Sequence, residues 1–231
     1  MRKLGFAAFL GVLSLSATAD ATTFYGYTAT PNGVVSGAAK TAHDSFIAAL
    51  STSSVEDIES FAVNQALPLA LSFEGSAGTV AATLSGSGQV RQAFNGLFPT
   101  SPSRELYATG DLTISFTGGV YAFGFYATDV SDFGSALSVT FNDGTAGSYQ
   151  VTTTAAKPDG NLLFFGLTSD TAITSVSLKG AKASDGFGYD DLTIGAPAAV
   201  PEPATWGMFI GGFGLVGGSL RRRQRTNLRF A

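Results

Sequence analysis

The feature that most constrains the fold is a regular succession of short alternating segments between Leu69 and Ile194. In segments such as Leu112-Thr113-Ile114-Ser115-Phe116, apolar and polar residues alternate, which is the period of a strand with one buried face. Turn signals such as Asn142-Asp143-Gly144 and Pro158-Asp159-Gly160 separate these segments. Strands of this spacing without βαβ alternation predict a mainly β fold, an antiparallel β-sandwich or jelly roll.

The expected strands include one segment near the N-terminus and a longer series in the second half of the chain. They cover residues 23–27, 69–73, 79–84, 112–116, 120–126, 137–141, 149–153, 162–167, 173–178 and 189–194. The run 162–167 is apolar throughout, apart from its glycine, and is predicted to be buried on both faces.

One or two short helices are expected between the first strand and the rest. From Ala38 to Leu50, apolar residues that include Phe46 recur at helical spacing and form one stripe. Ser53 and Glu56 stand at the spacing of a capping box, which predicts a second short helix or turn over residues 57–61.

The N-terminus has the pattern of a secretory signal peptide. Arg2 and Lys3 precede the apolar run Leu4 to Leu15, and small residues around Ala19-Asp20-Ala21 suit cleavage. We therefore expect residues 1–21 to be a signal peptide read by the Sec export machinery, and residues 22–196 to be an exported β-sandwich domain.

The C-terminal segment begins with Pro201-Glu202-Pro203 and continues with apolar or small residues from Ala204 to Leu220. Seventeen residues make a helix about 25 Å long at roughly 1.5 Å per residue, the lower limit for crossing a bilayer. A transmembrane helix over 204–220 is therefore predicted, and its six glycines favour a temporary anchor. Trp206 stands at an interfacial position, and Arg221, Arg222 and Arg223 would hold the far end in the cytoplasm.

This triplet, the Gly-rich apolar run and the arginine cluster, in that order, resemble the PEP-CTERM sorting signal. The resemblance implies that residues 197–231 form a linker, a helix and an arginine cluster recognised by an exosortase, a membrane enzyme. It further implies a Gram-negative cell that makes extracellular polysaccharide, and processing near Pro201, Glu202 and Pro203 after transient insertion in the inner membrane. The mature body would then reside at the cell surface or in the extracellular matrix.

Charge is segregated along the chain. Seven of the 13 basic residues lie in the two terminal segments, so six remain between residues 22 and 200 against 15 acidic ones. An acidic body without a basic patch argues against nucleic acid as a partner, because phosphate neutralisation needs clustered Lys and Arg. The chain has no cysteine, which excludes disulfides and Cys-ligated metals.

Acidic residues recur at strand ends and turns, which suits Ca²⁺ because this ion takes roughly six to eight oxygen ligands. The candidate ligands are Asp129, Asp132, Asp190 and Asp191. A second interpretation stays open, since Asp residues at turns commonly cap their own backbone.

The segment Asp185 to Ile194 looks like the closing strand of secreted jelly-roll domains, many carbohydrate-binding modules among them. Phe94, Phe98, Tyr107 and Tyr126 could stack on sugar rings or belong to the core.

The chain offers little for catalysis. Its single histidine, His43, lies on a helix without an evident orienting neighbour, and no carboxylate pair is marked as acid and base. We therefore expect a protein that is not an enzyme, with a structural or interaction role in the envelope or exopolysaccharide matrix. The alternative is a Ca²⁺-assisted carbohydrate-binding module, and a hydrolase is the third hypothesis.

Overall fold

The computed structural model describes residues 21–76, 78–133, 136–142, 148–149, 158–198 and 203–224. These residues form two units, divided between Pro197 and Ala198. Residues 1–20 of the predicted signal peptide and the motif residues Pro201 and Glu202 lie outside the described residues.

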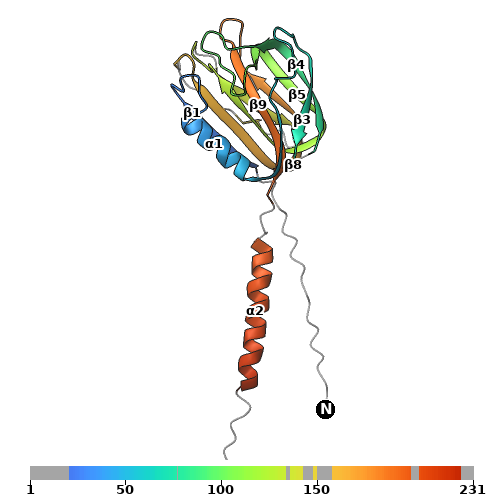
Figure 1. The fold of residues 1–231 in the computed structure, drawn as a ribbon. Coiled ribbons are helices and arrows are strands. Elements are labelled where there is room, and N and C mark those ends of the chain that lie inside the picture. The colour runs from blue at the N-terminus through green and yellow to red at the C-terminus, as the bar shows by residue number, and fades with distance from the viewer. Residues whose placement is uncertain are drawn as a thin grey trace, which may run out of the picture. The chain divides into compact units, whose positions relative to one another are not determined.

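The described part of the first unit contains nine strands and one helix (Figure 1). In chain order they are β1 (Ala21–Thr28), α1 (Gly37–Ala48), β2 (Leu50–Glu56), β3 (Leu69–Gly75), β4 (Val80–Arg91), β5 (Glu105–Thr128), β6 (Ser138–Asn142), β7 (Ser148–Tyr149), β8 (Leu162–Lys179) and β9 (Phe187–Pro197). All pairings between these strands are antiparallel. The prediction of a mainly β, antiparallel fold is confirmed.

The strands form one continuous sheet that closes on itself. Its order is β4-β3-β2-β9-β5-β8-β6-β7, with β1 on β8, and β4 also pairs with β5. This additional pairing joins β2, β3, β4, β5 and β9 into a closed five-stranded ring. Ring closure, which the sequence pattern did not predict, leaves these five strands without a free edge over much of their length.

The sheet is continuous because β5 and β8 are long, with 24 and 18 residues. The sequence analysis divided each of them into two strands, and in β5 the break between residues 112–116 and 120–126 falls at Gly118-Gly119. In the structure β5 runs through this point, and its pairing with β8 shifts register between Ser115 and Val120. The glycines therefore accommodate an irregularity within one strand, which sequence alone does not distinguish from a turn.

The main core lies on the inner face of the sheet. Phe123, Phe125 and Tyr189 are fully buried there, and the rings of Phe125 and Tyr189 meet edge to face at 5.6 Å. The run Leu162 to Leu167 is buried throughout, as its composition predicted.

Helix α1 covers the opposite face of the sheet beside β1 and β8 (Figure 1). Its Phe46 packs with Phe164 and Tyr126 in a second apolar cluster. The helix predicted over Ala38–Leu50 is confirmed, at Gly37–Ala48.

Of the helix or turn predicted over residues 57–61, the structure has the turn. Ser53 and Glu56 belong to β2, and the Glu56 carboxylate accepts hydrogen bonds from the backbone N–H groups of Ile58 and Ser72. The bond from Ser72 links Glu56 to β3. Residues 58–61 form a turn, in which the Phe61 N–H donates to the carbonyl of Ile58.

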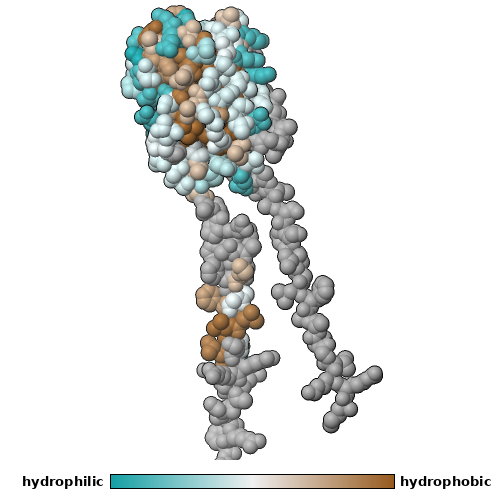
Figure 2. Space-filling model, turned by 90° about the vertical axis from the view of Figure 1, so that its right-hand side faces the viewer, coloured by the Kyte–Doolittle hydropathy of each residue, from teal (hydrophilic) through white to brown (hydrophobic). Residues whose placement is uncertain are grey.

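The second unit contains α2 (Pro203–Gln224), which confirms that the segment 204–220 is helical. Among the described residues, however, no helix has the length and apolar character that crossing a membrane requires. The large apolar side chains of α2 that the structure describes are exposed, and brown atoms mark apolar residues along this helix in Figure 2. The six glycines of the segment contribute no apolar side chain. The transmembrane helix predicted from the sequence is therefore not found.

The two ends of the β domain lie at the same end of the sheet. Ala21 pairs with Ser169, and Ala122 pairs with both Thr168 and Gly195, so the start of β1 and the end of β9 are neighbours along this row. Thr128, which pairs with Leu162 and Gly188, marks the opposite end. The acidic residues described next gather toward this opposite end.

Candidate functional site

Three aspartates beyond the ends of the long strands form a group that we call the aspartate cluster, Asp129, Asp132 and Asp159. One carboxylate oxygen from each lies within 4.8 Å of the other two. Asp129 follows β5 directly, and Asp159 belongs to the turn before β8. The structure thus brings together Asp129 and Asp132, as predicted, and adds Asp159.

Hydrogen bonds hold the two loops of the aspartate cluster together. The backbone N–H of Gly160 donates to Asp129 Oδ1 at 2.9 Å. The Asn161 amide accepts from the Val130 N–H and donates to the carbonyls of Val130 and Pro158. A Cβ at Gly96, where φ is +86°, would lie 2.9 Å from Asp129 Oδ1, so only glycine allows the 92–104 loop to approach so closely.

Asp129 and Asp132 of this cluster lie in an environment that disfavours their charge. Burial, followed by the charges of Asp132 and Asp159, raises the pKa of Asp129 to about 7. Burial and the neighbouring Asp185 raise the pKa of Asp132 to about 6. Carboxylates this close are stable when they share a proton or a cation, so the cluster has the chemistry of a cation site.

The other two predicted metal ligands, Asp190 and Asp191, are not part of the aspartate cluster. Asp190 is 1% exposed, and its Oδ2 accepts from the backbone N–H groups of Thr100 and Ser101 at 2.7 and 2.8 Å. Asp191 Oδ2 accepts from the Thr100 hydroxyl at 2.7 Å. Both carboxylates therefore hold the 92–104 loop.

A second group of oxygens surrounds the hydroxyl of Ser101 in the same loop. We call it the oxygen cage, consisting of the Asp57 carbonyl, Glu59 Oε1, the Arg104 carbonyl, and Oδ1 and Oδ2 of Asp190. The sequence analysis identified only Asp190 among these groups. Backbone carbonyls have no sequence signature, and Glu59 was not singled out.

Glu105, at the first position of β5, is a buried acid that the sequence analysis did not single out. It is 1% exposed, and its Oε2 accepts from the Thr128 hydroxyl at 3.0 Å. Its Oε1 has no hydrogen-bond partner among the described residues. Burial first, and then the charges of Asp190 and Asp129, raise the pKa of Glu105 to about 8.

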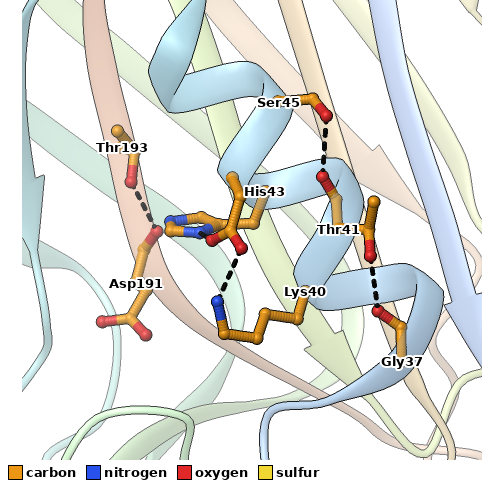
Figure 3. A network of polar contacts seen from close by, with 8 residues as sticks. Gly37, Lys40, Thr41, His43, Ser45, Asp191 and Thr193 are labelled. Atoms are coloured by element: carbon orange, nitrogen blue, oxygen red, sulfur yellow. Dashed lines mark hydrogen bonds and ion pairs between the residues drawn. The ribbon is translucent and has the colours of Figure 1, made fainter.

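His43 lies beside β9 and is drawn with its neighbours in Figure 3. Its Nδ1 lies 3.3 Å from Asp44 Oδ1, and its ring stacks on Tyr126 with the centroids 5.1 Å apart. The hydroxyls of Thr41 and Ser45 bond to helix carbonyls instead of the imidazole (Figure 3). This geometry gives His43 a packing role at the helix surface and supplies no nucleophile.

The candidate sugar-stacking aromatics divide between core and surface. Phe98 and Tyr126 are buried, whereas Phe94 is 49% exposed. The Arg91 guanidinium covers the ring of Tyr107 at 4.7 Å. Phe133, which the sequence analysis did not select, is 77% exposed, and its backbone N–H donates to Asp132 Oδ1.

Fold and site together define an acidic antiparallel β domain with oxygen-rich loops at one end, followed by a separate C-terminal unit. Residues 199–223 match the family model of the PEP-CTERM protein-sorting motif. The chain therefore carries this motif, the recognition signal of exosortase, and the resemblance noted in the sequence is confirmed. The motif marks an exported protein that is processed at a membrane.

No curated protein matches the chain. Among solved structures, the K2 cleaved adhesin domain of Lys-gingipain is similar with a TM-score of 0.40 and 11% identity, over 62% of this chain and 97% of that one. A xylan-binding domain from CBM 22 is similar with a TM-score of 0.31 and 14% identity, over 52% of this chain and 89% of that one. Likenesses of this degree assign no ligand to the present chain.

Proposed function

We propose that the β domain is a structural or interaction protein of the cell envelope or of the exopolysaccharide matrix, and not an enzyme. The observation that carries this proposal is the PEP-CTERM motif at residues 199–223, directly after a folded domain that ends at Pro197. After Sec export and transient association with the inner membrane, exosortase would process the chain near Pro201-Glu202-Pro203. The folded domain would then leave for the cell surface or the matrix.

The polar chemistry of the described residues supports a role without catalysis. The imidazole of His43 has an aspartate and two aromatic rings as its neighbours. The hydroxyl of Ser101 has carboxylates and backbone carbonyls as its hydrogen-bond partners among the described residues, and no imidazole is among these partners.

Mass spectrometry of the mature protein, with fractionation of the cells, tests this proposal. We expect a C-terminus near Pro201-Glu202-Pro203 and a body recovered from the surface or matrix fraction. Replacing the three residues of the triplet with alanine should leave the full-length chain in the membrane fraction. A triplet variant processed and delivered like the parent would contradict the proposal.

A second candidate function is Ca²⁺-assisted carbohydrate binding. Two exposed aromatic residues flank the aspartate cluster, and this arrangement favours it. Phe133 follows Asp132 directly, and Phe94 lies in a tight turn with Gly96, whose backbone contacts the cluster. Exposed aromatic faces can pack on sugar rings, and a bound Ca²⁺ would present open positions to hydroxyl groups.

A pull-down with matrix polysaccharides, with and without chelator, tests this second function. Binding should be lost in chelator and weakened by Phe133→Ser. Tyr121→Ser is the matched control, since Tyr121 is 43% exposed and directly precedes Ala122, which pairs with Thr168 near the other end of the sheet. Equal retention of the two variants, or no retention of the parent on any polysaccharide, would exclude this function.

A further inference from the structure

The oxygen cage around Ser101 contains more acceptors than one hydroxyl can satisfy. Ser101 Oγ lies 3.0 Å from the Asp57 carbonyl, 3.4 Å from the Arg104 carbonyl and 3.5 Å from Glu59 Oε1. Asp190 Oδ1 and Oδ2 lie 3.0 and 2.9 Å away. A serine hydroxyl has a single proton, so most of these five oxygens face the same point without receiving a hydrogen from it.

The two carboxylates of the cage are fixed in position by backbone N–H groups. Thr100 and Ser101 donate to Asp190 Oδ2, and Ser103 and Arg104 donate to Glu59 Oε1 at 2.7 Å each. The donors all belong to the 92–104 loop. The loop therefore orients both carboxylates and contributes a carbonyl of its own, that of Arg104.

The protein compensates the charges of the two cage carboxylates unequally. Burial of Glu59 is outweighed by the hydrogen bonds from Ser103 and Arg104, which lower its pKa, whereas Asp190 is poorly compensated. Asp190 is 1% exposed, and burial with the charge of Asp191 raises its pKa to about 7. The Arg104 guanidinium donates to the carbonyls of Glu59 and Phe61, which directs part of its hydrogen-bonding capacity away from the carboxylates.

Glu105 supplies a separate observation. Leu106 pairs with Tyr189, and this register places Glu105 across from Asp190 on the same face of the sheet. Glu105 is 1% exposed, its Oε1 has no hydrogen-bond partner among the described residues, and Asp190 is the charge that raises its pKa most. A buried carboxyl oxygen without a partner is rare in folded proteins, and a proton on the carboxyl or a bound cation nearby would account for it.

We propose that the oxygen cage is a calcium site, formed by Glu59, Asp190 and the carbonyl oxygens of Asp57 and Arg104. Ca²⁺ takes roughly six to eight oxygens at about 2.3–2.6 Å and accepts carbonyl and bidentate carboxylate ligands, whereas Mg²⁺ demands a tighter octahedron. The two ligand carboxylates match the charge of the ion. Rotation of the Ser101 side chain would free the centre, and a small contraction of the cage would bring its oxygens to bonding distance.

The proposed calcium site shares no residue with the aspartate cluster. The proposal does not depend on the function proposed for the protein. Its ligands come from the segment after β2, from the 92–104 loop and from β9. A bound ion would therefore link three segments that are far apart in the sequence. It would hold the 92–104 loop against the five-stranded ring and, by binding only the folded state, raise the stability of that state.

Calcium titration of the purified, chelator-treated protein tests the proposal, with calorimetry and the melting temperature as readouts. An Asp132→Asn background weakens the aspartate cluster, so that the cage dominates the measurement. We expect Ca²⁺ to bind and to raise the melting temperature. Asp190→Asn should weaken binding by at least the roughly 10–100-fold that loss of a supporting partner of a metal ligand costs.

Ser101→Ala separates a calcium site from a plain hydrogen-bond hub. The variant removes the hydroxyl but keeps all five oxygens, so calcium affinity should be retained or increased. If the Asp190→Asn protein does not fold, Glu59→Gln serves as the ligand variant, since Glu59 is only partly buried. No effect of calcium on the Asp132→Asn protein would overturn the proposal, as would a loss in Ser101→Ala as large as that in Asp190→Asn.

Discussion

Replacing Gly166 with alanine tests how α1 is seated on the sheet. Gly124 and Gly166 are cross-strand neighbours on β5 and β8, and together they leave room for the ring of Phe46. A Cβ at Gly166 would lie 2.8 Å from Phe46 Cδ2 and 3.1 Å from Phe164 Cε1, closer than ordinary contacts of 3.4–4 Å. Phe46 is fully buried and cannot move into solvent without giving up its packing.

The expected cost follows from two opposing effects. Overpacking of a core costs about 1–3 kcal/mol. Replacing glycine also reduces the conformational freedom of the unfolded chain, which stabilises the folded state by about 0.4–1 kcal/mol. We therefore expect Gly166→Ala to lower the free energy of unfolding by about 1–2 kcal/mol, a fall of roughly 2–8 °C in melting temperature for a domain of this size.

Urea denaturation and thermal unfolding measure this effect against a matched control. Gly118→Ala places its Cβ where no atom lies within 4 Å, so it should be neutral or slightly stabilising. In a Phe46→Ala background, which itself costs about 3–5 kcal/mol, the penalty of Gly166→Ala should largely disappear. Equal effects of the two glycine variants, or a penalty unchanged without Phe46, would refute the proposed contact.

Two further predictions concern the aspartate cluster in chelator. The pKa of Asp129 is raised from 3.8 to about 7, so between these values the folded state binds more protons than the unfolded state, and stability should fall as pH rises from about 4 to about 7. Asp129→Asn should flatten this slope in urea denaturation at several pH values, and an unchanged slope would contradict the assignment. Asn161→Ala should cost about 1–3 kcal/mol, because it leaves the buried N–H and carbonyl of Val130 without their partner. Gln92 is exposed, so Gln92→Ala should change the free energy of unfolding little in the same experiment. Equal losses of stability in the two variants would contradict this role of Asn161.

Much of the local structure was predictable from the sequence because its signals are contiguous. The alternation in residues 112–116 and the apolar run 162–167 mark strands, and the apolar stripe around Phe46 marks α1. Over residues 57–61 the sequence left a helix or a turn open. The structure has the turn, because the Glu56 carboxylate accepts from the backbone N–H of Ser72, 16 residues away, instead of forming a capping box with Ser53. The capping-box pattern compares residues three positions apart, so it does not detect a hydrogen-bond partner this far away in the sequence.

The candidate site was predictable only in part. Asp129 and Asp132 lie three positions apart, and the structure places them in one cluster, which Asp159 joins from the turn before β8. Asp190 lies among oxygens from residues 57, 59 and 104, two of them backbone carbonyls. No pattern in side-chain type reveals a carbonyl that points to a distant carboxylate.

The sequence by itself determined the sorting motif at residues 199–223, the antiparallel β class and the acidity of the body. Each is a property of neighbouring residues or of composition. Only the tertiary structure decided that β4 pairs with β5 to close a five-stranded ring. It also decided which acids meet, since ring closure and the course of the 92–104 loop depend on contacts between segments remote in the chain. Such contacts depend on the packing of the whole core, so the local hydrophobic periodicity of the sequence does not predict them.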